Sequence, residues 1–218
     1  MHYDLNKIIV KTEYSAKSVK QPNQIVLNYI NTLPREATVL DYGCGKYRYT
    51  IPISKKVKTV VAVDSRYQIE RLQRINDKTM SLKTYTEKYL KNVILIESEN
   101  ERWRSKYDYI FCTNVLSAIP ERPTRIDVLR NLKKSLTQNG RMFLCVQYRN
   151  TYFERYNDLH GVVHCNNGWI IPLGKDYTYY GIIPPEELEK LCTETEMEVI
   201  SRKIKDGSCF FEAKHREQ

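Results

Sequence analysis

Two glycines and an acid follow short apolar runs, at positions where they could hold a ligand. The segment Val-Leu-Asp-Tyr-Gly-Cys-Gly at 39–45 has the character of a strand that ends in Gly-x-Gly. Glycines at such a point allow a tight turn and let a ligand approach the backbone. About nineteen residues after Gly45, a second apolar run ends in Asp64, where a carboxylate can accept both hydroxyls of a ribose. The spacing predicts a nucleoside site between the turn and Asp64.

Asp41 indicates which kind of nucleoside would bind. A carboxylate directly before the glycines would face the pyrophosphate of a dinucleotide, whereas it suits a ligand that carries an ammonium group. S-adenosylmethionine (SAM) carries that group on its methionine end. The charge therefore favours SAM over a nicotinamide dinucleotide, and a nicotinamide-dependent oxidoreductase is the less favoured alternative.

Alternating apolar and amphipathic segments must position these residues. Five apolar runs predict strands, at 39–45, 59–63, 93–96, 107–112 and 142–146. Helical periodicity predicts helices at 24–30, 67–75 and 126–136, the last one stopped by Asn139-Gly140. This order predicts an α/β, Rossmann-like, doubly wound and mostly parallel sheet with helices on both faces.

The carboxyl-terminal third has a different pattern. An aromatic-rich stretch at 148–181 reads as irregular and precedes a helix that begins around Pro184-Pro185. Two final apolar runs flank Asp206-Gly207, a two-residue turn signal that predicts an antiparallel hairpin. We expect one domain over 1–218, with an N-terminal helical segment at 1–36 and the aromatic-rich segment as an insertion.

The order of motifs resembles that of class I SAM-dependent methyltransferases. VLDYGCG, VVAVD, NVILIESEN, YDYIFCTNVLSAIP and NGRMFLCV carry the resemblance, over 38–146. It implies a Rossmann-like methyltransferase in which the glycine turn lines the methionine and ribose, Asp64 binds the ribose and the segment after the fourth strand faces the transferred methyl group. The residues that it assigns to the cofactor are Asp41, Gly43, Cys44, Gly45, Asp64, Ser65, Ser98, Glu99, Cys112, Thr113 and Asn114.

The chain departs from the family pattern after Gly45. The family usually has a third glycine two places later, and this chain has Lys46-Tyr47-Arg48. The loop is therefore bulkier and more basic, and a non-catalytic SAM-binding or interaction module is a second hypothesis.

The acceptor of the methyl group is open between two classes. The fourth-strand motif lacks the Asp/Asn-Pro-Pro-aromatic and Pro-Cys signatures of base-methylating enzymes, which slightly favours a small molecule over DNA or RNA. Methyl transfer needs alignment more than acid or base help, so no catalytic residue is assigned. His160 and His164 share the spacing of a helical face, but no clear third ligand joins them and no metal is expected. The candidate substrate residues are Tyr14, Tyr148, Tyr152, His160 and His164.

Composition sets the remaining expectations. Apolar residues make up 41% and charged residues 28% of the chain, and no apolar run reaches the roughly 18 residues of a membrane span. With no secretory signal pattern, the protein is expected to be cytoplasmic, its six dispersed cysteines free thiols. The net charge of +9 favours phosphate-rich partners, but the basic residues are spread along the chain. No oligomeric state is predicted.

Overall fold

The computed structural model describes residues 2–5, 7–16, 20–149 and 154–216. The chain forms two compact units, each assembled from separate stretches of sequence. Unit 1 comprises Met1–Ser15, Cys112–Lys134 and Met142–Gln218, and unit 2 comprises Ala16–Phe111 and Ser135–Arg141.

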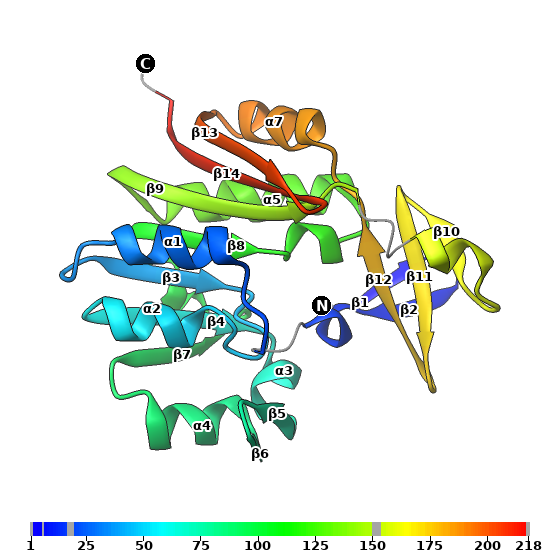
Figure 1. The fold of residues 1–218 in the computed structure, drawn as a ribbon, viewed down its shortest axis with the longest axis horizontal. Helices are drawn as coiled ribbons and strands as arrows, with labels where there is room; N and C mark the ends of the chain where they lie inside the picture. Colours follow the sequence, from blue (N-terminus) through cyan, green and yellow to red (C-terminus); the bar gives the residue numbers. More distant parts are fainter. Residues whose placement is uncertain (1, 6, 17–19, 150–153, 217–218) are drawn as a thin grey trace. The chain divides into compact units, whose positions relative to one another are not determined.

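A seven-stranded sheet has the order β13-β14-β9-β8-β3-β4-β7 (Figure 1). Its strands are β3 (Thr38–Tyr42), β4 (Thr59–Asp64), β7 (Val93–Glu97), β8 (Tyr107–Thr113), β9 (Leu136–Gln147), β13 (Met197–Lys205) and β14 (Ser208–His215). β4 pairs in parallel with both β3 and β7, and β14 pairs antiparallel with β9 and β13. The apolar runs form the strands because their side chains are buried on both parities, as in parallel sheets. The expected α/β fold with a terminal hairpin is confirmed.

Unit 2 contains short helices in addition to its part of the sheet. They are α1 (Gln24–Thr32), α2 (Thr50–Lys56), α3 (Arg66–Glu70) and α4 (Leu82–Tyr89), with η2 (Glu101–Trp103). The predicted helix at 67–75 is wrong beyond Glu70, because β5 (Gln73–Ile75) and β6 (Lys78–Met80) form a hairpin there. Asn76 takes a φ of 52° in its turn, and Leu72 is 77% exposed, so the three-residue apolar repeat marks no buried helix face.

Unit 1 contains a five-stranded sheet that the sequence did not predict. Its order is β1-β2-β12-β11-β10, from β1 (His2–Leu5), β2 (Ile8–Lys11), β10 (Val163–Cys165), β11 (Gly168–Leu173) and β12 (Asp176–Gly181). The prediction of a helical segment over 1–36 is wrong at residues 2–5 and 8–11, where β1 and β2 pair as an antiparallel hairpin before η1 (Thr12–Ser15). The stretch at 148–181, predicted as irregular, contains β10, β11 and β12, with η4 (Arg155–Asp158) before them.

Ion pairs between side chains connect two helices of unit 1. Helix α5 (Arg122–Lys134) follows η3 (Leu116–Ala118), and α7 (Pro185–Glu194) begins with proline in its first turn as predicted. The Arg122 guanidinium lies 2.6 Å from carboxylate oxygens of both Glu187 and Glu194. The expected stop at Asn139-Gly140 is wrong, because α5 ends at Lys134 and these two residues lie inside β9. A Cβ on Gly140 would come within 2.8 Å of the Leu136 side chain, so the glycine serves close packing in the strand.

The cysteines and the helices bear on two further expectations. The six thiols are free, and all but that of Cys165 are buried. Within the described ranges, none of the helices has the length and apolar composition that a membrane crossing requires.

Candidate cofactor site

The glycine turn is fixed against the carboxyl end of β4. Gly43 and Gly45 have φ values of 70° and 58°, in the left-handed region that glycine adopts without steric cost. The amides of Gly43 and Cys44 donate to the Val63 carbonyl at 2.8 and 3.0 Å. The turn therefore has one defined position beside the strand that ends in Asp64.

The Asp64 carboxylate connects the turn to the start of α3. Its Oδ2 accepts from the Gly45 amide at 2.8 Å, and its Oδ1 accepts from the Ser65 amide at 2.8 Å. A carboxylate oxygen can accept more than one hydrogen bond, so Asp64 is chemically suited to ligand hydroxyls. Asp64 is only half-buried, which gives a ligand access. Ser65 is buried, and its Oγ caps α3 by accepting from the Gln68 amide.

Gln68 provides a second support for the turn that sequence reasoning missed. Its Nε2 donates to the Gly45 carbonyl at 2.6 Å and to Gln73 Oε1 at 2.8 Å. Both glutamines are buried, and Gln73 donates back to the Gln68 carbonyl at 2.8 Å. A signal was present, because Ser65-x-x-Gln68 has the capping-box spacing that marks the start of a helix.

Asp41 is a buried acid with an unusual titration range. It is 1% exposed, and its Oδ2 accepts from the Thr50 hydroxyl at 2.5 Å. Burial raises the pKa of Asp41 to about 7; the Thr50 bond opposes this rise and the nearby Asp64 charge adds to it. The carboxyl is therefore poised between its neutral and charged forms near neutral pH, and a cation would favour the charged form. Thr50 carries no sequence signal for this contact.

Cys44 and Tyr47 complete the turn without adding a reactive group. Burial and the charges of Asp64 and Asp41 raise the pKa of the Cys44 thiol well above its usual value, so the thiol stays protonated. Tyr47 has a φ of 64° although it is not glycine, and its side chain is fully buried. Its hydroxyl shares a 2.6 Å hydrogen bond with Thr86 on α4. The ring thus packs toward α4, and the position two residues after Gly45 keeps a left-handed backbone without its glycine.

Ser98 lies beside the same strand end. Its amide donates to the Asp64 carbonyl at 2.8 Å, and its carbonyl accepts from Trp103 Nε1 at 2.9 Å. Glu99, the next residue, is exposed. Unit 2 therefore brings the turn, Asp64, Ser65 and Ser98 together around the carboxyl ends of β3, β4 and β7, where open α/β sheets bind ligands.

The other three residues assigned to the cofactor belong to unit 1. Cys112 and Thr113 are buried at the end of β8. Asn114 has a φ of 62°, and its amide donates to the Cys145 carbonyl at 2.7 Å on β9. The backbone turns sharply at this point, directly after the strand.

The candidate substrate residues all lie in unit 1, and Tyr152 falls outside the described residues. The Tyr14 hydroxyl donates to Asp176 at 2.9 Å, which ties η1 to β12. The Tyr148 amide donates to the Gly207 carbonyl at 3.0 Å. His160 is exposed in a turn, and His164 on β10 hydrogen-bonds Asn157 at 2.7 Å. The two histidines therefore do not share a helical face, contrary to their spacing. The described residues contain no group of three His, Cys, Asp or Glu side chains that could hold a metal.

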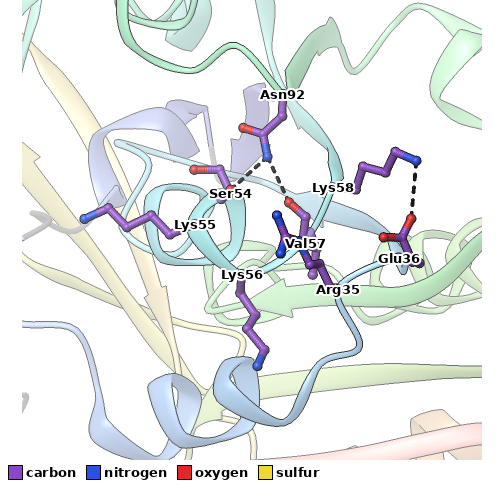
Figure 2. Close-up of a pocket in the computed structure, with 8 residues that line it drawn as sticks. All are labelled: Arg35, Glu36, Ser54, Lys55, Lys56, Val57, Lys58 and Asn92. Atoms are coloured by element: carbon purple, nitrogen blue, oxygen red, sulfur yellow. Dashed lines mark hydrogen bonds and ion pairs between the residues drawn. The ribbon is translucent and has the colours of Figure 1, made fainter.

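A basic cavity of about 750 Å³ lies at the opposite, amino ends of the strands in unit 2 (Figure 2). The Asn92 amide group donates to the carbonyls of Ser54 and Val57 at 2.8 and 2.9 Å, which satisfies the end of α2. Figure 2 shows Lys55 and Lys56 extending in different directions. Cations at this place stabilise the carboxyl end of α2, so the cavity has a structural explanation.

Comparison with known proteins identifies the family. A family model described as a methyltransferase domain matches residues 16–202. The chain belongs to this family. The match spans the glycine turn, Asp64 and the whole parallel part of the sheet, so the resemblance read from the motifs is confirmed and this methyltransferase is an enzyme by family.

One curated relative and two solved structures resemble the chain over most of its length. The uncharacterized protein YmfD of Escherichia coli K12 is 29% identical over 211 residues, covering 96% of this chain and 94% of YmfD. The PH0226 protein of Pyrococcus horikoshii OT3 superposes with a TM-score of 0.70 at 13% identity, covering 93% of this chain and 95% of that one. A Burkholderia thailandensis 1,6-didemethyltoxoflavin-N1-methyltransferase, solved with its substrate and S-adenosylhomocysteine, gives 0.61 at 14% identity, with coverages of 94% and 80%. At these sequence identities, the two solved structures show that the chain shares their fold.

Proposed function

We propose that this methyltransferase transfers a methyl group from SAM to a small molecule, with the cofactor held by the residues around the glycine turn of unit 2. The observation that carries the proposal is the pair of carboxylates at the carboxyl ends of β3 and β4, one buried and one half-buried. Both lie beside a turn whose two glycines have left-handed φ values.

The donor set fits the chemistry of SAM. SAM is a net cation with an ammonium and a sulfonium group, and the two carboxylates attract positive charge. The negatively charged pyrophosphate of a dinucleotide would instead be repelled by them. Asp41 would hold the ammonium end, because its raised pKa falls toward normal when a cation offsets its burial. Asp64 would accept hydrogen bonds from the ribose hydroxyls. Ser65 and Ser98 would border the adenine, and Gly43 and Gly45 would let the nucleoside approach the backbone.

The chain's own contribution to the reaction is binding and orientation. When bound, SAM supplies an electrophilic methyl group that is transferred by in-line displacement. Such a step gains most of its rate from alignment of the reacting groups and from exclusion of water. A turn with one fixed position would therefore aid the reaction by orienting the bound cofactor. Cys112, Thr113 and Asn114 would face the methyl group, as the family resemblance implies.

The small-molecule acceptor is supported by unit 1. Its aromatic side chains cluster around Trp169, with Tyr156 at 6.3 Å and Tyr156 stacked on Tyr180 at 6.4 Å between ring centroids. The Burkholderia thailandensis enzyme that is similar to this chain acts, by its name, on 1,6-didemethyltoxoflavin, a small molecule. The alternative, a nucleic-acid acceptor, is favoured by the net charge of +9. Many basic side chains are nonetheless engaged by acids, such as Lys133 with Glu196 at 2.7 Å.

Transfer of labelled methyl groups tests the proposal. The protein is incubated with methyl-tritiated SAM and a cell extract separated into small-molecule, nucleic-acid and protein fractions. We expect label in the small-molecule fraction, its loss with Asp64→Ala, and its retention with Asp77→Asn, a control whose carboxylate is 86% exposed in the same unit. Label in nucleic acid would reject the small-molecule acceptor, and no label in any fraction, despite SAM binding, would favour a non-catalytic module.

A further inference from the structure

Unit 1 contains a cavity of about 810 Å³ that the proposed methyl transfer does not use. It lies between the start of α5, the turn before β11 and the start of α7. Its volume is within the range of roughly 300–1,000 Å³ that small-molecule sites occupy. The lining residues used below are Pro120, Glu121, Arg125, Asn167, Ile182 and Glu187.

Arg125 is a buried cation in the wall of this cavity. Arg125 is only 5% exposed, and its Nε donates a hydrogen bond to the Ile119 carbonyl at 2.7 Å. Its Nη2 is buried and has no hydrogen-bond partner in the part of the chain that the structure describes. Burial lowers the pKa of the Arg125 guanidinium, but an arginine keeps its proton in proteins. A buried charge with an unused donor is costly unless something complements it.

The protein's own acids do not neutralise Arg125. Tyr179 favours the charge of Arg125 through a side-chain hydrogen bond, but burial raises the pKa of this phenol to about 12, so it is neutral near pH 7. Glu187 also favours the charge, but that carboxylate binds Arg122 at 2.6 Å. Glu121 is exposed and accepts from the Thr124 hydroxyl at 3.1 Å. An exposed acid is screened by water and contributes little to a buried cation. A complementary negative charge would therefore have to come from a ligand.

The rest of the lining is partly apolar. Pro120 is buried, and Ile182 packs against the buried pair Trp169 and Ile171. Apolar walls with a few convergent polar groups are typical of small-molecule sites. A ligand that matches both features has an anionic end and an apolar remainder.

We propose that this cavity binds a small molecule that carries a carboxylate on an apolar body, with the carboxylate against Arg125. A guanidinium recognises a planar carboxylate through its fork of N–H donors. The inference does not rest on methyl transfer, so its failure would leave the proposed function intact.

Nuclear magnetic resonance titration with benzoate tests the site on the full-length ¹⁵N-labelled protein. We expect saturable shifts of the Arg125 Nε–Hε signal and of the amides of Asn167 and Ile182, with a Kd of about 1 mM. Benzamide, the neutral isostere, should bind at least about tenfold more weakly, and inorganic phosphate should not compete at equal concentration. Equal binding of benzamide, equal competition by phosphate, or no saturation by about 50 mM benzoate would overturn the proposal.

Three variants separate binding from folding. Arg125→Gln should abolish the benzoate shifts. Since a buried arginine also supports the fold, Asn167→Asp provides a second test: Asn167 is exposed, lines the cavity and has a φ of 58° that aspartate tolerates. Its added negative charge should weaken benzoate about threefold and leave benzamide unchanged. Arg130→Gln, on the exposed side of the same helix, should bind benzoate like the wild type; unchanged benzoate affinity in Asn167→Asp would contradict the site.

Discussion

Protonation of Asp41 should weaken the binding of S-adenosylhomocysteine, which keeps the ammonium end of SAM. With a pKa of about 7, Asp41 is about 90% ionised at pH 8 and about 10% ionised at pH 6. If only the charged form holds the ammonium group, the Kd rises about tenfold between pH 8 and pH 6. The change arises from a single buried carboxyl that is 1% exposed.

Calorimetric titration at several pH values, with two variants, isolates this effect. The ligand's own ammonium titrates equally in every protein, so the ratio of Kd values between wild type and Asp41→Asn reports Asp41 alone. We expect the ratio of the Asp41→Asn Kd to the wild-type Kd to be about ten times larger at pH 8 than at pH 6. Thr50→Val removes the hydroxyl bond that lowers the pKa of Asp41, so its transition should move to higher pH. A constant ratio of Kd values from pH 6 to pH 8 would refute the reasoning.

Ionisation of the same carboxyl should lower the folding stability of the ligand-free protein, although it strengthens ligand binding. Its pKa in the folded chain lies above the ordinary value of 3.8 for an aspartate, so the folded state binds the proton more tightly than the unfolded state. Stability therefore falls as the pH rises from about 4 to 7, by roughly 4 kcal/mol for this group alone. Chemical denaturation of Asp41→Asn should show this loss removed, with a variant more stable than wild type at pH 8 and weaker in ligand binding.

Three further substitutions test the supports of the two units. Asp64→Ala should weaken S-adenosylhomocysteine about a hundredfold by calorimetry, because it removes charge-assisted bonds to the ligand and to Gly45, whereas Asp77→Asn should not change it. Tyr47→Gly should relieve a left-handed backbone strain of about 1–2 kcal/mol but lose a buried ring worth about 3–5 kcal/mol, so denaturation should show a net loss of stability. Gly168→Ala would place a Cβ 2.2 Å from the Tyr180 carbonyl and should lower the thermal midpoint far more than Gly174→Ala, which meets no atom within 4 Å.

The sequence predicted the elements whose signal is local. The parallel strands were visible because continuous apolar runs are typical of strands buried on both faces. The final hairpin was visible because Asp206 and Gly207 suit a turn with positive φ, and both adopt it, at 50° and 71°. The turn at Gly43 and Gly45 was likewise predictable from residue type alone.

Long-range pairing defeated the rest. β2 gains its place beside β12 through a pair as distant in sequence as Val10 and Tyr177, and no window of sequence contains both. At the site, Asp41 and Thr50 are only nine residues apart, but their contact depends on how α2 packs, which residue types alone do not show. Tyr47 shows the converse case, because tertiary packing of its ring holds a backbone conformation that its residue type disfavours.

The central claim is that the glycine turn and the two carboxylates hold SAM. Binding of S-adenosylhomocysteine, the product that remains after methyl transfer, tests this claim directly at pH 8. Calorimetry should show one saturable site per chain with a Kd near or below about 100 μM. Absence of heat at about 1 mM ligand, from a folded sample, would contradict the assignment of this site.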